Sequence, residues 1–249
     1  MSTKKEAQPA VFYIFMVWVM ASGLFAFSIP EKLAAQSRLN QGSLEYEVSL
    51  QAGLPQGPFR DQLDTIGLGL NMMGGYRLPG LPLMAGLDIN FLTFGRDSRS
   101  EPLSSTIPDV QVRVDNSYNM VSSFATLRMG GQERRFAPYI EGLAGFNYLY
   151  TQSTVHNSID GEQVFSDINV DDFSFSYGIG AGAQYLIWDG GAIYNSLMYL
   201  NLQLRYIRGG QAEYVRPGTI ENVDGFLEYE AANSRTDLMY IRLGLSFRI

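Results

Sequence analysis

The feature that most constrains the fold is the stretch from Asp237 to Ile249, in which every second side chain is apolar. Successive side chains of an extended strand point to opposite faces, so one face of this strand is apolar throughout. Its members are Met239, Ile241, Leu243, Leu245, Phe247 and Ile249. The other face carries Tyr, Arg, Gly and Ser. Because the apolar face has no polar tail to leave in water, the pattern predicts that the strand belongs to a closed sheet.

Seven further stretches alternate in the same way, which makes eight predicted strands. The seven are residues 44–54, 66–77, 83–91, 116–129, 140–148, 173–187 and 198–206, of which the fourth is the least regular. The connections between the eight strands alternate between long and short, and the long ones are 55–64, 96–115, 151–171 and 209–235. Long loops at one end and tight turns at the other are typical of a transmembrane barrel. The sequence therefore predicts an all-β, eight-stranded antiparallel up-and-down barrel, closed by pairing of the last strand with Leu44–Leu54.

The N-terminal residues read as an export signal. Lys4 and Lys5 precede an apolar run from Val11 to about Ile29, and small residues follow near Ala35. This order is typical of a secretory signal peptide with its cleavage region. We expect residues 1–36 to be the signal peptide and residues 37–249 to form the barrel domain. An uncleaved membrane-anchor helix is the alternative, since the run is long for a signal core.

Composition decides which face of the predicted strands is wet. A soluble barrel of the lipocalin type has the same alternation with its apolar side chains inside. Its outer face would carry many lysines and glutamates, whereas residues 37–249 contain 15 arginines, 23 acidic residues and no lysine. The polar faces carry mainly Gly, Ser, Asn and Gln, which suit a narrow lumen. The apolar faces are rich in Phe and Tyr near the strand ends, as expected at membrane interfaces.

The same composition excludes several classes of function. The acidic balance argues against binding to nucleic acid, which needs a basic face. The chain has no cysteine, so disulfides, thiolate metal sites and a lipidated N-terminal cysteine are excluded. We expect neither a cofactor nor a metal.

With its hairpin rhythm, its alternation and its closing strand, the stretch 43–249 resembles the small eight-stranded outer-membrane barrels, the group that includes the OmpA transmembrane domain and the OmpX and OmpW types. The resemblance implies a location in the outer membrane of a Gram-negative bacterium. The expected partners are outer-membrane lipid and lipopolysaccharide, and we expect a monomer. In that group the last strand ends in an aromatic residue that the barrel-assembly machinery reads. Here Ile249 stands in that place and Phe247 lies two residues before it.

Charged residues fall on the faces that the pattern assigns to the lumen. The predicted polar cluster consists of Glu45, Glu47, Asp88, Glu141, Arg205 and Arg242, with Arg77, Arg128 and Arg248 as further cations. Charges enclosed in a narrow barrel are unfavourable unless paired, so we expect a plug of ion pairs that stabilises and seals the barrel. A gated proton or ion path is the alternative. Of the two arginines on the closing strand, we expect Arg242 to pair with the acids of the first, third and fifth strands.

One loop motif suggests an enzymatic alternative. His156 is the sole histidine, and Ser158 follows two residues later. Such a pair resembles part of the site of lipid A deacylase barrels, in which histidine acts as base for the serine. Those enzymes carry an asparagine directly after the serine, where this chain has Ile159. The better interpretation is an incidental loop histidine, and the expected function is non-enzymatic: envelope structure, surface interaction through the loops, or limited passage of small solutes.

Overall fold

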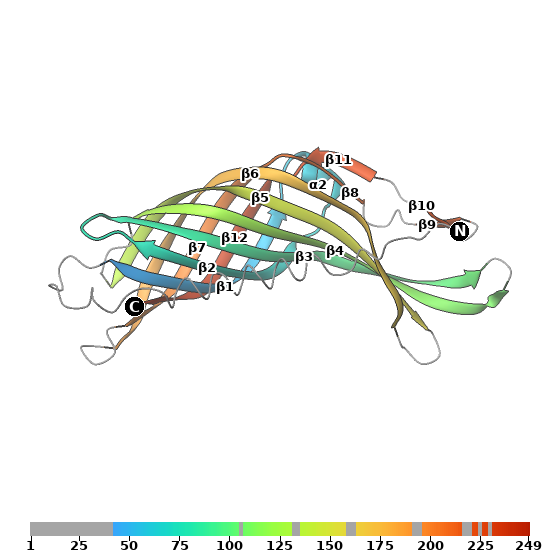
Figure 1. The fold of residues 1–249 in the computed structure, drawn as a ribbon, viewed down its shortest axis with the longest axis horizontal. Helices are drawn as coiled ribbons and strands as arrows, with labels where there is room; N and C mark the ends of the chain where they lie inside the picture. Colours follow the sequence, from blue (N-terminus) through green and yellow to red (C-terminus); the bar gives the residue numbers. More distant parts are fainter. Residues whose placement is uncertain are drawn as a thin grey trace, which may run out of the picture. The chain divides into compact units, whose positions relative to one another are not determined.

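A computed structural model describes residues 42–104, 107–130, 135–157, 163–190, 196–215, 221–223, 226–228 and 231–249. The predicted signal peptide, residues 1–36, lies outside this part of the chain. Eight strands form a closed antiparallel barrel in the order β1-β12-β7-β6-β5-β4-β3-β2 (Figure 1). The predicted fold class is therefore confirmed. Among the described residues no helix is long and apolar enough to cross a membrane.

The barrel strands follow the predicted alternation, and all of them except β2 and β12 are longer than the sequence suggested. They are β1 (Ser43–Pro55), β2 (Gly67–Arg77), β3 (Leu83–Ser104), β4 (Ile107–Gly130), β5 (Phe136–Asn157), β6 (Gln163–Asp189), β7 (Leu197–Gly209) and β12 (Leu238–Arg248). We call the end at which β1 begins and β12 ends the turn end, and the opposite end the loop end. The predicted closure is confirmed, because β1 pairs with β12 from Glu45 opposite Arg248 to Pro55 opposite Leu238.

All four predicted long loops contain regular structure instead, and in three of them this structure is β-strand. Residues 96–115 continue β3 and β4 as a paired hairpin, and β5 and β6 extend in the same way through much of 151–171. Both hairpins run past the barrel in Figure 1. The last connection holds four short strands: β8 (Gln211–Val215), β9 (Glu221–Val223), β10 (Phe226–Glu228) and β11 (Ala231–Arg235). The polar composition of these three stretches suggested loops. Strand pairing nevertheless satisfies their backbone N–H and C=O groups, and it does not depend on apolar side chains.

The connections at the two ends of the barrel differ in kind. At the turn end, the amide of Leu81 donates to the carbonyl of Leu78 (3.4 Å) and Gly80 has φ 72°, as in a type II turn with Pro79 before the glycine. At the loop end, the first connection contains α2 (Pro58–Gln62), which begins at Pro58, a residue suited to the first helical turn. The sequence predicted only a loop at this place.

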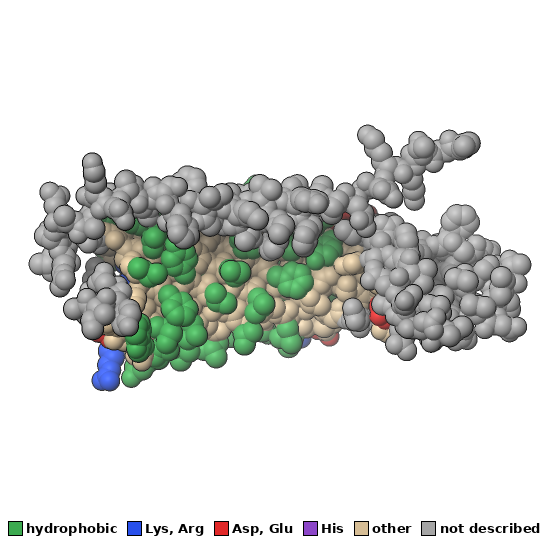
Figure 2. All heavy atoms as spheres, turned by 60° about the horizontal axis from the view of Figure 1, so that its bottom comes forward, with side chains coloured by type: hydrophobic (Ala, Val, Ile, Leu, Met, Phe, Trp, Pro, Cys, Tyr) green, Lys and Arg blue, Asp and Glu red, His purple; other side chains and the backbone are tan. Residues whose placement is uncertain are grey.

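The outer wall of the barrel is apolar. Leu50 is 68% exposed, Leu68 65% and Ile179 71%, although all three lie within barrel strands or at their edge. Figure 2 shows apolar side chains spread over the visible wall, with charged side chains only near its two ends. Charged and amide side chains instead occupy the interior, as the alternation of the strands requires. The molecule thus has the reverse of the polarity of a soluble barrel.

Candidate functional site

Nine charged side chains meet inside the turn-end half of the barrel, and together we call them the charged layer. They are Glu45, Glu47, Arg77, Asp88, Arg128, Glu141, Arg205, Arg242 and Arg248. Each lies at an inward-facing position of its strand, and none is more than 7% exposed. The structure thus brings together all six residues of the predicted polar cluster and the three additional arginines.

Glu45 is the centre of the part of the layer nearest the turn end. Its carboxylate accepts hydrogen bonds from Arg77 (2.8 Å), Arg128 (3.2 Å) and Arg248 (3.2 Å). Gln184 also donates to this carboxylate. Glu47 pairs with Arg128 at 3.2 Å and accepts from the hydroxyl of Ser49 at 3.0 Å. Three guanidinium groups therefore share the carboxylate of Glu45.

A second group lies deeper in the barrel. Asp88 accepts from Arg205 at 2.8 Å and from Arg242 at 3.1 Å. Arg205 also pairs with Glu141, which in turn pairs with Arg128 at 3.2 Å and so joins the two groups. Charges buried away from water are tolerated when each finds opposite charge and hydrogen-bond partners, which is the arrangement here.

Tyrosine rings and amides complete the charged layer. The guanidinium of Arg128 lies 4.0 Å from the ring centroid of Tyr139, and that of Arg248 lies 4.8 Å from the centroid of Tyr199. These are cation–π distances. The amide oxygens of Gln51 and Gln203 each accept from Arg242 at 3.0 Å. The layer is thus a fixed hydrogen-bonded network that spans the interior.

The pairing predicted for Arg242 of the closing strand is confirmed for the acid of β3 and wrong for the acids of β1 and β5. Arg242 contacts the acid of β3, Asp88, and otherwise amide groups. Among the described contacts, Arg248 is the arginine of the closing strand that binds Glu45 of β1, together with Arg77 and Arg128. The other acid of β1, Glu47, pairs with Arg128, and the acid of β5 pairs with Arg128 and Arg205. The reason is geometric: Arg248 lies directly opposite Glu45 in the β1–β12 register, whereas Arg242 lies opposite Gln51.

The loop-end half of the interior contains a cluster of buried apolar side chains, beside buried polar ones such as Ser174 and Thr236, and the sequence interpretation missed this cluster. Its buried side chains come mainly from inward positions of the strands and include Leu92, Phe94, Met120, Phe124, Leu143, Ile207, Leu238 and Tyr240. We call this set, with its caps described below, the apolar layer. The signal was present in β3, where the inward face continues from Asn90 to Leu92 and Phe94. Ending that strand at Phe91 hid it.

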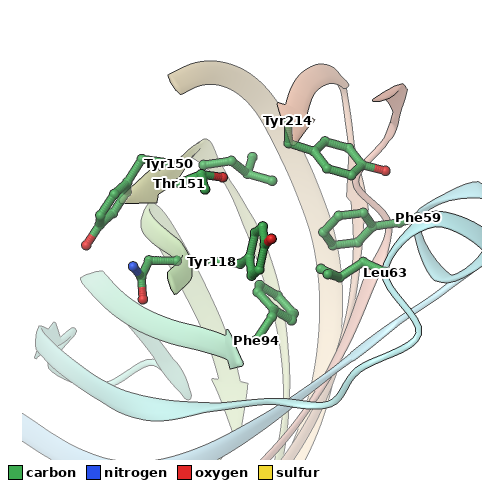
Figure 3. Close-up of a pocket in the computed structure, with 9 residues that line it drawn as sticks. Phe59, Leu63, Phe94, Tyr118, Tyr150, Thr151 and Tyr214 are labelled. Carbon is green, nitrogen blue, oxygen red and sulfur yellow. The ribbon is translucent and has the colours of Figure 1, made fainter. Parts of the chain in front are cut away.

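Two segments from the connections cap the apolar layer. Phe59 of α2 is fully buried and packs edge-on against Phe94 (5.8 Å between ring centroids) and against Tyr214 of β8 (5.3 Å). Figure 3 shows these rings pointing toward one another in the mouth of the barrel, with Leu63 and Tyr118 beside them. The cavity they leave is about 20 Å³, room for roughly one water molecule. No small-molecule ligand fits there without movement of these segments.

Of the two residues in the predicted catalytic alternative, the structure describes only His156. His156 lies near the end of β5, where its backbone pairs with Arg113 and Gln163. Ser158 lies outside the described residues, so the proposed pair stays a prediction. Within the described ranges, no cluster of three or more His, Asp or Glu side chains could hold a metal ion.

No protein-family model matches the chain, and no curated protein matches it either. Three solved structures share its fold. Neisserial surface protein A has 12% identity over 84% of this chain and 96% of its own, with a TM-score of 0.39. A major outer membrane protein from Thermus thermophilus has 15% identity over 83% and 99%, with a TM-score of 0.45. The Yersinia pestis outer membrane protein Ail has 14% identity over 84% and 100%, with a TM-score of 0.31. The likeness concerns the barrel fold and nothing beyond it.

Proposed function

We propose that the protein is an integral outer-membrane barrel with a sealed interior that acts without catalysing a reaction, through its place in the envelope and its surface at the loop end. The observation that carries this proposal is the reversed polarity of the strands. Large apolar side chains such as Leu50 and Ile179 are 68% and 71% exposed, while Arg128 and Asp88 are fully buried. In water such a wall would be an extended apolar patch, whereas lipid solvates it.

The filled interior favours a structural role over solute passage. An eight-stranded barrel has space inside for little more than its own side chains. Here the charged layer closes the turn-end half, and the apolar layer closes the loop-end half. Of the roles predicted from the sequence, envelope structure and surface interaction therefore gain support, and limited solute passage loses it.

The surface for interaction lies at the loop end. The β3–β4 and β5–β6 hairpins continue the barrel wall past the point where β2 and β7 have ended their pairing. We infer that these hairpins face the outside of the cell. The apolar wall would contact outer-membrane lipid and lipopolysaccharide, and the closing strand would engage the barrel-assembly machinery, with the barrel working as a monomer.

One substitution on the wall tests the membrane location. Leu50→Arg places a charge at mid-strand on the outer face, where arginine costs about 2–4 kcal/mol at the bilayer midplane. The wild-type protein should need detergent for extraction from outer membranes and should migrate differently on a gel before and after heating. The variant should reach the membrane in a smaller amount, while the matched variant Leu50→Met should behave like the wild type. Recovery of the wild type as a soluble monomer without detergent would refute the proposal.

Two further measurements separate the alternatives. Folded protein in planar bilayers should give no single-channel steps, because both halves of the interior are filled; steady conductance would restore the solute pathway. Mass spectrometry of lipid A from cells with and without the protein should give the same profile. Loss of an acyl chain that depends on both His156 and Ser158 would instead establish the enzymatic alternative.

A further inference from the structure

One arginine of the barrel wall points outward at the loop end. Arg208 lies near the end of β7, and its side chain is exposed. Along the outer face of β7 it follows a run of exposed apolar and aromatic side chains, which are Leu200, Leu202, Leu204 and Tyr206. Among the described residues Arg208 forms no ion pair and no side-chain hydrogen bond. An accessible guanidinium with free donors therefore stands at the loop-end limit of the apolar wall on this strand.

The position of Arg208 matches the surface of a bilayer. At about 3.3 Å per residue, the ten positions from Met198 to Arg208 span about 33 Å along β7. At the usual strand tilt of about 40°, this span gives a height of about 25 Å, the height of the apolar band of an outer-membrane barrel. If the apolar wall faces lipid, Arg208 therefore lies at the level of the lipid headgroups on the loop-end side.

Two tyrosines flank this arginine on the outer face. Tyr206 precedes it by two residues on β7, and Tyr177 of β6 lies directly opposite it in the β6–β7 register. Both rings are exposed on the wall. Tyrosine is enriched where a membrane meets water, because its ring is apolar and its hydroxyl is polar. The flanking residues thus support a headgroup-level position for Arg208.

A second arginine lies beside the end of β7. Arg235 of β11 is paired with Gln211, three residues after Arg208, and the amide of Thr236 donates to the carbonyl of Gly210 at 3.1 Å. These backbone contacts hold β11 against the end of β7.

The charge of Arg235 is already balanced. It is within electrostatic range of Tyr177 and Tyr206, the same two tyrosines that flank Arg208. Its side chain is 41% exposed, while Nη2 is held by the buried carboxylate of Asp237. The accessible charge without a described counter-ion at this place is therefore that of Arg208, with the remaining donors of Arg235 close by.

We propose that Arg208, assisted by Arg235, binds the headgroup phosphate of lipopolysaccharide in the leaflet that surrounds the loop end. A guanidinium fork matches the oxygens of a phosphate and keeps its charge at any physiological pH. The acyl chains of the same lipid would lie against Leu204 and Leu202 below, which a free phosphate ion could not do. The inference rests on the proposed membrane location and names the lipid and the residues that hold it.

Native mass spectrometry of the folded protein in a non-ionic detergent tests the site. Titration with diphosphoryl lipid A should give saturable binding, and lipid A without its phosphates should bind about tenfold more weakly. Arg208→Gln should weaken binding of the diphosphoryl form roughly tenfold, as expected for the loss of a charged hydrogen-bonding partner. The same variant should bind the dephosphorylated form like the wild type. Arg208→Lys, which keeps the charge and loses the fork, should lie between Arg208→Gln and the wild type.

Two control variants separate this site from a general effect of charge. Arg60→Gln removes an exposed arginine of α2, whose charge is paired with Asp64, and should bind diphosphoryl lipid A like the wild type. Arg235→Gln should weaken binding less than Arg208→Gln does, because Asp237 already balances the charge of Arg235.

Competition identifies the source of the phosphate. Inorganic phosphate, added at the concentration at which lipid A half-saturates the protein, should leave the lipid bound. Displacement at that concentration would overturn the lipid assignment in favour of a free anion. Short-chain phosphatidylglycerol should also compete poorly, and an affinity equal to that of lipid A would overturn the choice of lipopolysaccharide.

Equal binding of the two forms of lipid A by the wild type, or unchanged binding by Arg208→Gln, would overturn the site itself. Heat-modifiable migration on a gel shows that each variant is folded, which we expect because Arg208 is exposed. A wild-type barrel that needs detergent for extraction but binds both forms equally loses the site and keeps its membrane location. Recovery of the wild type without detergent would instead remove the proposed function as well.

Discussion

The two halves of the interior fill the same narrow cross-section by opposite means. In the charged layer, every side chain depends on particular partners: Glu45 on three arginines, and Arg128 on three carboxylates. In the apolar layer, side chains such as Leu92 and Phe124 depend on volume and shape alone. Apolar side chains therefore close the barrel interior as well as charged ones do. The charged layer, however, should tolerate substitutions far less well, because each of its side chains needs a particular partner.

The halves also differ in what builds them. The charged layer uses only strands that pair around the whole barrel, so its geometry is set by the closed sheet. The apolar layer needs Phe59 from α2 and Tyr214 from β8, which belong to the connections. Connections can open locally at less free energy than a closed sheet. We therefore expect loop-end changes to be absorbed locally and changes in the charged layer to affect the whole barrel.

The largest expected effect is that of Arg128→Met. Arg128 is fully buried, and its removal leaves Glu47 and Glu141 each without one cation and Glu45 with two cations instead of three. Removing one partner of a buried ion pair costs about 3–5 kcal/mol, because the remaining charge is left uncompensated. The free energy of unfolding should fall by that amount in urea titrations of the barrel in lipid vesicles.

The control for Arg128→Met is Arg60→Met. Arg60 pairs with Asp64 at 3.6 Å on the surface, with its side chain 68% exposed, and such pairs contribute about 0–1 kcal/mol. If the free energy of unfolding fell by the same small amount in both variants, the charged layer would be solvated. The charged and apolar layers would then not differ in their tolerance of substitution.

A smaller effect is expected from Leu92→Ala in the apolar layer. Leu92 is fully buried and lies against the lumen-facing side of Gly53. Truncating a buried leucine costs about 2–5 kcal/mol, with the low end where neighbours collapse into the space. Because the capping segments can move inward, we expect the low end, about 2 kcal/mol, in the same urea titration, clearly less than for Arg128→Met. A loss as large as that of Arg128→Met would mean that the apolar layer is as rigid as the charged one.

Much of the barrel was predictable because alternation is a property of each strand by itself. The inward placement of Glu45, Asp88 and Arg205 follows from counting positions by two. The closing pair β1 and β12 follows from the up-and-down order. The inward placement and the strand order depend only on the alternation within each strand and on the short connections. Both of these can be read directly from the sequence.

The rest depends on distances across the interior, which no single strand encodes. That Arg248 binds Glu45, while Arg242 binds Asp88, follows from register and strand tilt. That Phe59 closes the mouth depends on the path of a connection whose composition reads as a loop. The hairpin formed by residues 96–115 was missed because most of its residues are polar, although backbone pairing does not require apolar side chains.

The smallest expected effect comes from a methyl group added beside the charged layer. A Cβ at Gly180 would lie 2.8 Å from Cγ of Arg205 and 2.8 Å from Oε1 of Glu141, so Gly180→Ala must displace an ion pair that the closed sheet holds in place. Overpacking costs about 1–3 kcal/mol, and we expect the low end, about 1 kcal/mol, because only one methyl group is added.

The matched control for Gly180→Ala is Gly142→Ala. It adds the same atom next to Glu141 in sequence, where no described atom lies within 4 Å of the new Cβ. This variant should be neutral or gain up to about 1 kcal/mol, because alanine restricts the unfolded chain. The two unfolding curves, measured side by side in urea, should move in opposite directions or by clearly different amounts. Equal curves would mean that the Arg205–Glu141 pair shifts freely, and the charged layer would then tolerate change as readily as the apolar layer does.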